Sequence, residues 1–160
     1  MKVRLSVWAV LALVLSLVFP WVRQLPYGAY LPDVWLLLLL LAVPTPHPHA
    51  VSKPLILAAC LALLRSAVSL CSPIASFASL CAGMLLREKM SRRLSDSLFV
   101  YRFIVGMTSA LPMALIDMAI AKNHGFIADP TIWIWRAALT GFLIAVFTRR
   151  SGGLMFGAKR

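Results

Sequence analysis

Four charged residues stand within or beside long apolar segments, and they are the residues of this chain best placed to do chemistry. Their surroundings are "LPDVWLLLLLLAV" for Asp33, "LALLRSAVS" for Arg65, "MALIDMAIA" for Asp117 and "IWIWRAALT" for Arg136. A charge is costly in apolar surroundings, so such residues form a functional site or pair with one another. Two acids and two bases can pair without leaving net charge, and we expect the four to form one polar cluster.

This cluster allows two interpretations. In one, ionic contacts hold helices together and the longer side chains reach toward the membrane surface. In the other, the cluster lines a cavity for a ligand or a partner helix. For Asp33 a local role also suffices. Pro32 is tolerated in the first turn of a helix, and the carboxylate then lies at the positive N-terminal end, where it contributes about 0.3–1 kcal/mol.

Other residues that could carry chemistry lack the partners that known sites require. His47 and His49 in "PTPHPHA" have no third or fourth ligand nearby, so we expect no metal site. The chain contains no H-E-x-x-H, G-x-S-x-G or P-loop motif. We therefore expect no catalytic residues, no cofactor and no enzyme activity. A membrane enzyme for lipid-linked substrates, with arginines for phosphate and Asp33 or Asp117 as base, remains an alternative.

The composition indicates a membrane protein. Hydrophobic residues make up 61% of the 160 residues and charged residues 13%, with a mean hydropathy of +0.89. Soluble domains average about 45–50% apolar and about 25% charged residues. The net charge of +11 could suggest nucleic-acid binding, but the basic residues lie between apolar segments and form no aromatic-interleaved patch. We expect an all-α, polytopic membrane helix bundle that contacts the lipid bilayer and no nucleic acid.

Six apolar segments are expected to form this bundle as a single transmembrane domain, residues 1–160. A bilayer core of about 30 Å needs about 20 helical residues, so the second and fourth segments are short for a full crossing. Either all six cross, or four cross and two are partly inserted. The first segment resembles a signal peptide, but no cleavage site follows, so we expect it to stay. The segments are 5–21, 32–43, 54–70, 73–86, 99–120 and 131–147, followed by a basic cytoplasmic tail, 148–160.

The basic residues predict the orientation. With the N-terminus in the cytoplasm, most of the 16 lysines and arginines fall on the cytoplasmic side, and only Arg23 and Lys122 fall in outer loops. This asymmetry predicts a multi-pass protein with both termini in the cytoplasm. The inner loop "REKMSRRLSDS", which starts at Arg87, anchors this topology or docks to anionic lipid or a cytoplasmic partner. The polar cluster then lies near the outer surface.

Small residues at helical spacing predict one close-packed helix face. Small side chains let membrane helices approach each other closely. In "SPIASFASLCAG" the face consists of Ser72, Ala75, Ser76, Ser79, Ala82 and Gly83.

The order of these features resembles the MreD family, the rod-shape-determining membrane proteins. A short basic start and a first span are followed by an aromatic-x-Pro-Asp sequence that leads into a leucine-rich second span, "YLPDVWLLLLLLAV". A Pro/His turn, a third span with a small-residue turn, a basic inner loop, a fifth span with a late carboxylate ("ALPMALIDMAIA") and a sixth span complete the order. Arg65 departs from it, because the family usually carries an acidic residue near this place.

This resemblance implies a non-enzymatic scaffold subunit of the bacterial cell-elongation complex, in the cytoplasmic (inner) membrane. Its partners would be an MreC-like bitopic membrane protein and, through it, the actin-like MreB filament and the peptidoglycan synthases. The implied fold resembles the six-helix substrate-binding subunits of energy-coupling-factor vitamin transporters. That likeness gives the alternative function, a small-molecule (vitamin-like) binding subunit of a membrane transporter, whose pocket the polar cluster would line.

Overall fold

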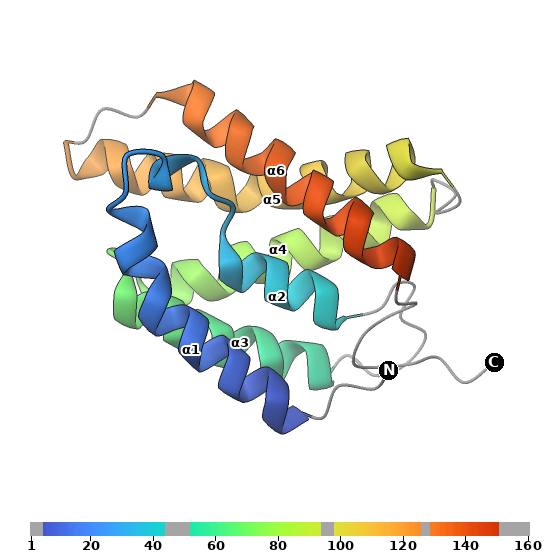
Figure 1. Ribbon diagram of the computed structural model, residues 1–160, viewed down its shortest axis with the longest axis horizontal. Coiled ribbons are helices and arrows are strands. Elements are labelled where there is room, and N and C mark those ends of the chain that lie inside the picture. Colours follow the sequence, from blue (N-terminus) through green and yellow to red (C-terminus); the bar gives the residue numbers. More distant parts are fainter. Residues whose placement is uncertain (1–4, 44–51, 94–97, 126–128, 151–160) are drawn as a thin grey trace.

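The chain folds into helices joined by short connections (Figure 1). The computed structural model describes residues 5–43, 52–93, 98–125 and 129–150. Over these ranges there is no strand, which confirms the expectation of an all-α protein. The helices are α1 (Leu5–Arg23), α2 (Val34–Ala42), α3 (Ser52–Val68), α4 (Pro73–Ser91), α5 (Phe99–Asn123) and α6 (Pro130–Arg150), with a short 3₁₀ helix, η1 (Gly28–Tyr30), between α1 and α2.

Helix α2 lies in the middle of the bundle. It packs against α1, α3, α4 and α6, while α5 packs against α4 and α6. In Figure 1, α1 and α3 run along one side of α2, and α5 and α6 run along the other. The starts of α1, α3 and α5 point toward the same end of the molecule as the ends of α2, α4 and α6. Successive helices therefore alternate in direction.

The central position of α2 follows from its sequence, VWLLLLLLA. Leucine is a strong helix former, and a helix that is apolar all round is buried. Leu36, Leu39 and Leu40 are at most 1% exposed. The helix begins at Val34, so Pro32 lies before it and not in its first turn as expected. Its 9 residues rise about 13–14 Å, less than half of a bilayer core of about 30 Å.

Helix α4 is longer than expected and includes the start of the polar inner loop. The expected segment ends at residue 86, whereas the helix continues to Ser91. Arg, Glu, Lys and Met favour helix, and Glu88 forms an ion pair with Arg92 one turn later, at 2.5 Å. The other helix ends lie within three residues of the expected positions.

Glycines allow α5 to approach its two neighbours closely. A Cβ atom added at Gly106 of α5 would stand 2.9 Å from the Cα of Gly141 on α6. A Cβ atom added at Gly83 of α4 would stand 2.8 Å from the carbonyl oxygen of Ser109 on α5. Neither distance leaves room for a side chain, so these helix pairs depend on glycine at the crossing.

The predicted small-residue face of α4 is correct in its central part. Ser76, Ser79 and Gly83 are buried, at the three- and four-residue spacing of one helix face. Ser72 is exposed instead and acts as the N-cap of α4, where its hydroxyl oxygen accepts a hydrogen bond from the backbone N–H of Ala75 at 3.2 Å. A serine directly before a proline-started helix favours capping over packing.

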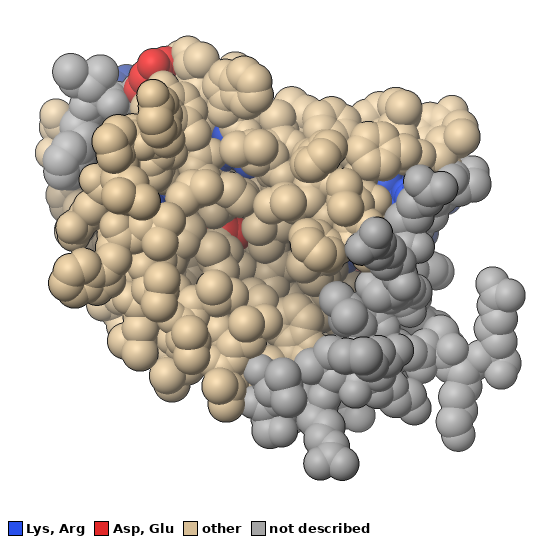
Figure 2. All heavy atoms as spheres, in the orientation of Figure 1, with Lys and Arg blue, Asp and Glu red and all other residues tan. Residues whose placement is uncertain are grey.

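The outward surface is strongly apolar. Side chains more than half exposed occur on all the longer helices, for example Leu17, Leu63, Ile74, Leu115 and Trp135. Figure 2 shows one face on which most atoms belong to uncharged residues, with charged atoms mainly near the ends and at a few points between them. Soluble monomers rarely expose contiguous apolar patches larger than a few hundred Å², so exposed apolar side chains on every longer helix favour contact with lipid or a partner.

Within the described residues, two helices are long and apolar enough to cross a membrane, by length and composition. They are α5 and the part of α6 from Pro130 to Thr148, with mean hydropathies of 1.8 and 1.5. Only 28% and 33% of their most apolar windows are buried inside the fold, whereas the core helix of a soluble protein is mostly buried. The crossing of a membrane by all six helices stays a prediction.

Candidate functional site: a buried arginine–aspartate cluster

Asp33 is the N-cap of α2 and uses its two carboxylate oxygens for different purposes. Its Oδ1 atom accepts hydrogen bonds from the backbone N–H groups of Trp35 at 3.1 Å and Leu36 at 3.3 Å. These are N–H groups that have no partner within the helix, and Asp is among the best residues for this position. The Oδ2 atom remains for other partners, and the whole residue is only 4% exposed.

Arg65 of α3 is the centre of the cluster and is 2% exposed. Its Nε atom donates to Asp33 Oδ2 at 3.1 Å, and its Nη1 atom donates to the hydroxyl of Ser76 on α4 at 3.3 Å. Its Nη2 atom donates to the carboxylate of Asp117 on α5. One guanidinium therefore binds the start of α2, the first turn of α4 and the C-terminal part of α5. The planar fork of arginine places its donors on three separate nitrogens, whereas the three donors of lysine share one nitrogen and cannot span acceptors spread along such a fork.

Arg136 of α6 joins the cluster at longer range. Its Nη2 atom lies 3.8 Å from Asp33 Oδ2 and 3.7 Å from Asp117 Oδ2, and its side chain is 8% exposed. These distances keep the charges paired but exceed the length of a direct hydrogen bond. The guanidinium also lies over the ring of Trp133, 4.7 Å from its centre, in a cation–π contact.

The structure thus brings the four residues named from the sequence, Asp33, Arg65, Asp117 and Arg136, into one buried group of balanced charge. Whether this group is structural or binds a partner stays a prediction. Ser76 was expected only as a packing residue, and its bond to Arg65 was missed. The signal was present, because two buried arginines carry ten N–H donors and two carboxylates offer only about eight acceptor sites.

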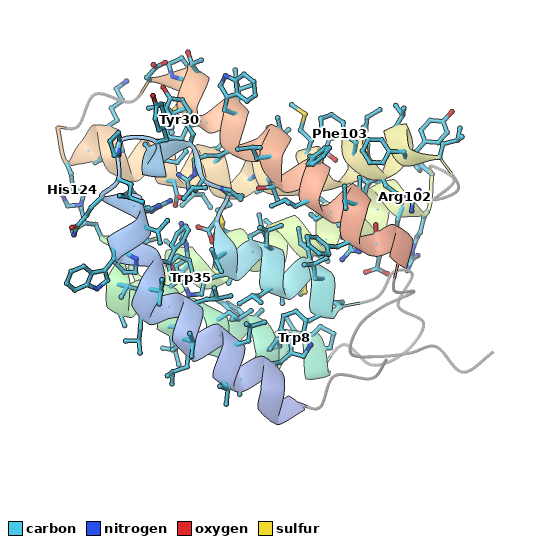
Figure 3. The ribbon with its side chains drawn as sticks, viewed as in Figure 1. Trp8, Tyr30, Trp35, Arg102, Phe103 and His124 are labelled. Atoms are coloured by element: carbon cyan, nitrogen blue, oxygen red, sulfur yellow. The ribbon has the colours of Figure 1, made fainter. Side chains whose placement is uncertain are left out.

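A second contact that sequence reasoning missed ties α1 to the start of α2. The indole N–H of Trp35 donates to the hydroxyl of Ser16 on α1 at 2.8 Å, and the ring of Trp35 meets the ring of Phe19 edge-on at 5.2 Å. Figure 3 shows the labelled Trp35 between α1 and α2. The guanidinium carbon of Arg23 lies 5.1 Å from the centre of the Phe19 ring, in a cation–π contact. These contacts hold the segment that carries Asp33.

Arg87 corrects the prediction for the inner loop. It was expected in that loop, but it lies in α4 and is 6% exposed. Its Nη1 atom donates to the carbonyl oxygens of Leu40 and Val43 at the C-terminal end of α2, the second at 2.9 Å. The last carbonyl groups of a helix have no partner within it, so Arg87 completes the end of α2 opposite to Asp33.

A small cavity of about 20 Å³ adjoins the cluster. Its polar lining consists of Asp33, Asp117, Arg136 and Thr140. Ligand pockets for metabolites usually enclose about 300–1,000 Å³, so this cavity accepts a far smaller occupant. Among the described residues no group of three His, Cys, Asp or Glu side chains could hold a metal ion. His47 and His49 lie outside the described residues.

The acidic residue closest in sequence to α6 stands apart from the cluster. Asp129 precedes that helix, and its Oδ1 atom accepts a hydrogen bond from the backbone N–H of Thr131 at 2.9 Å. This bond stabilises the charged form and lowers the pKa of the Asp129 carboxyl. The carboxylate is exposed, so its role is to cap α6.

No protein-family model, curated protein or solved structure matches this chain. The resemblance to the MreD family therefore stays a prediction, and function has to be inferred from the residues and their geometry.

Proposed function

We propose that this chain is a multi-pass membrane protein of the MreD type, a non-enzymatic scaffold subunit of the bacterial cell-elongation complex. The observation that carries this proposal is the use of the buried charges. The guanidinium of Arg65 donates hydrogen bonds to three elements of its own chain, and both oxygens of Asp33 accept hydrogen bonds within the chain. These charges assemble a rigid helical unit with an apolar exterior, which suits contacts with lipid and with partner helices.

Membrane insertion is supported by the surface and by the backbone. Large apolar side chains such as Leu17 on α1, Ile74 on α4 and Leu115 on α5 are 60–82% exposed. Such a surface is unfavourable in water and favourable in lipid. Helices are also suitable for lipid because they satisfy their own backbone groups. In this proposal the ends of α4 and α6 and the starts of α1, α3 and α5 face the cytoplasm, as the basic residues predict.

A membrane enzyme is disfavoured by the same contacts. A carboxylate that acts as a general base must be able to reach the substrate. Asp33 and Asp117 are 4% and at most about one-tenth exposed, and Arg65 pairs with both of them. Of the arginines that could bind a phosphate, Arg65 donates directly to both carboxylates and Arg136 lies within 3.8 Å of them.

The alternative, a vitamin-like binding subunit of a transporter, is disfavoured by volume. The cavity beside the cluster measures about 20 Å³, whereas a metabolite needs about 300 Å³ or more. Binding would require Arg65 and Arg136 to separate from the two aspartates. A buried charge left without its partner costs about 3–5 kcal/mol, so a ligand would have to replace the ionic partner that each group loses.

The partner of this scaffold would be an MreC-like bitopic protein. It would dock a single helix on the apolar exterior and connect the chain to the MreB filament and the peptidoglycan synthases. Packing between membrane helices depends on close contact and small residues and needs no site of reactive groups. This partnership follows from the resemblance to the MreD family, and the exposed helices provide apolar surface for it.

The test is a tagged pull-down from gently solubilised native membranes, with photo-crosslinking residues at exposed and buried positions. Leu17 and Leu63 are 63% and 61% exposed, and the matched control is Leu39, which is 0% exposed. We expect a single-span protein with a large periplasmic domain, crosslinked from an exposed position and not from Leu39. Wall-synthesis enzymes should accompany it.

Other outcomes separate the competing functions. Recovery of an ATPase-bearing transport module would support the transporter subunit instead. Recovery of no membrane partner at all, with the chain stable and abundant, would contradict the scaffold function. Release of the chain from membranes by alkaline carbonate would contradict its insertion.

A further inference from the structure

Arg136 is the member of the cluster whose hydrogen bonds the protein leaves incomplete. A guanidinium carries five N–H donors, and burying them in an apolar interior without acceptors is energetically unfavourable. Its nearest carboxylate oxygens are 3.7 and 3.8 Å away, and among the described residues no group accepts a direct hydrogen bond from its side chain. The side chain is nevertheless more than nine-tenths buried. Arg65, by contrast, has three direct acceptors.

The cavity beside the cluster lies where Arg136 needs a partner. Arg136, Asp33, Asp117 and Thr140 all line it, and Met113 and Ala114 of α5 form part of its apolar wall. Its volume is about 20 Å³. A single water molecule needs about 10–15 Å³ of such volume and two to four polar partners. Both conditions are met for one water, whereas the volume is far too small for a metabolite.

The charge of the lining decides what kind of occupant is stable. Asp33 and Asp117 in the lining repel an anion. Arg136 in the lining repels a cation, as does Arg65, which is paired with both aspartates. A neutral group that both donates and accepts hydrogen bonds meets neither repulsion. Contacts between polar groups across more than about 3.5 Å are commonly bridged by water.

We propose that this cavity is a binding site for one ordered water molecule that joins Arg136 to both aspartates. The water oxygen accepts a hydrogen bond from Arg136 Nη2, and its two hydrogens go to Asp33 Oδ2 and Asp117 Oδ2. This makes three hydrogen bonds, the usual number for a buried water. The site is independent of the scaffold function, since it concerns only the assembly of α2, α5 and α6.

Ala114 offers a matched pair of variants that tests this site. Ala114→Val and Ala114→Thr add side chains of nearly equal size and shape, and both displace the water. Only threonine places a new hydroxyl in the cavity, so we expect Ala114→Thr to melt about 2–4 °C above Ala114→Val. In an apolar cavity without water, Ala114→Val would melt above Ala114→Thr, because the added hydroxyl would be buried without a hydrogen-bond partner. A valine variant as stable as the threonine variant, or more stable, overturns the proposal.

Arg136→Met supplies the control for specificity. If the difference between the two variants arises from hydrogen bonding to Arg136, it disappears when Ala114→Thr and Ala114→Val are compared in the Arg136→Met background. A difference that persists unchanged there assigns the effect to helix preference or packing and refutes the water site.

A second measurement does not depend on stability. Met113 lines the cavity and is only 2% exposed to bulk solvent. Brief X-ray irradiation generates hydroxyl radicals from water, including ordered water, and these oxidise an adjacent methionine. In the unaltered chain we expect Met113 to be oxidised at a rate close to that of the partly exposed Met118 on the same helix, and Ala114→Val to reduce this rate several-fold. Oxidation of Met113 that is slow and unaffected by Ala114→Val overturns the proposal.

Discussion

Replacing Arg65 by methionine should destabilise the protein more than the same replacement of any other arginine or lysine, inside or outside the cluster. Methionine keeps much of the length and packing of arginine but removes its charge. Asp33 and Asp117 would then remain buried, with only the distant Arg136 to balance them. Removing one partner of a buried ion pair costs about 3–5 kcal/mol. For a chain of this size the apparent melting temperature should fall by roughly 6–20 °C.

The assay is a thermal melt of the purified protein in one detergent or in nanodiscs, followed by size-exclusion chromatography. Two matched variants calibrate it. Arg136→Met removes contacts of 3.7 and 3.8 Å while Arg65 still holds both carboxylates, so we expect a smaller loss, about 1–2 kcal/mol. Arg92→Met removes the ion pair with Glu88, in which the arginine side chain is 63% exposed, and should cost about 0.3–0.5 kcal/mol.

The order of these three losses is what the geometry predicts. If Arg65→Met melts within error of Arg92→Met, the central role of Arg65 is refuted. If Arg136→Met is as damaging as Arg65→Met, the two arginines share the carboxylates equally and the three-way contact of Arg65 is not dominant. A further variant, Arg65→Lys, should recover only part of the stability, because the three donors of lysine share one nitrogen while the acceptors bind three different nitrogens of Arg65.

Three more substitutions test the ends and crossings of helices by the same melts. Asp33→Asn keeps an oxygen for the cap but removes the charge and should cost about 2 kcal/mol or more, while Asp33→Ala should cost about 1 kcal/mol beyond that; equal losses would contradict the capping role. Arg87→Met should cost about 2 kcal/mol or more, because the carbonyl groups of Leu40 and Val43 lose their donor, and a neutral effect would show that these contacts contribute nothing. Gly141→Ala should cost about 1–3 kcal/mol although alanine favours helix, since the added Cβ would stand 2.7 Å from a backbone oxygen of α5; a stabilised variant would contradict the close approach.

The cluster could be predicted because its members conflict with their surroundings. A carboxylate or guanidinium within a run of leucine, isoleucine and alanine demands a partner of opposite charge. Only a few residues of this kind exist in the chain, so pairing Asp33 and Asp117 with Arg65 and Arg136 needed no three-dimensional information. The helices were predictable for a related reason, since apolar runs separated by polar and proline-rich turns set their limits within a few residues.

The contacts that sequence reasoning missed depend on partners without a sequence signature. Arg87 binds two backbone carbonyl groups, and every residue has one. In the sequence Arg87 stands first in a series of basic residues, so a loop role was the natural interpretation. Ser76 and Ser16 each provide one hydroxyl to a side chain on another helix, and their identity as small helix-packing residues hides this use.

The short central helix explains why this fold carries buried charges at all. In the proposed membrane setting, the 9 residues of α2 are too few to reach both surfaces, and the residues that bind its two ends, Asp33 and Arg87, are only 4% and 6% exposed. The N–H groups at its start and the C=O groups at its end therefore need partners within the protein. Asp33 accepts hydrogen bonds from the N–H groups, and Arg87 donates to the C=O groups. Each residue has the charge that the helix dipole favours at its end of the helix. The carboxylate of Asp33 then requires a buried cation, which Arg65 provides, and the guanidinium of Arg65 in turn binds Asp117. We infer that each charge follows from the one before it, beginning with the length of α2, and that a structural origin accounts for the whole cluster without any reaction.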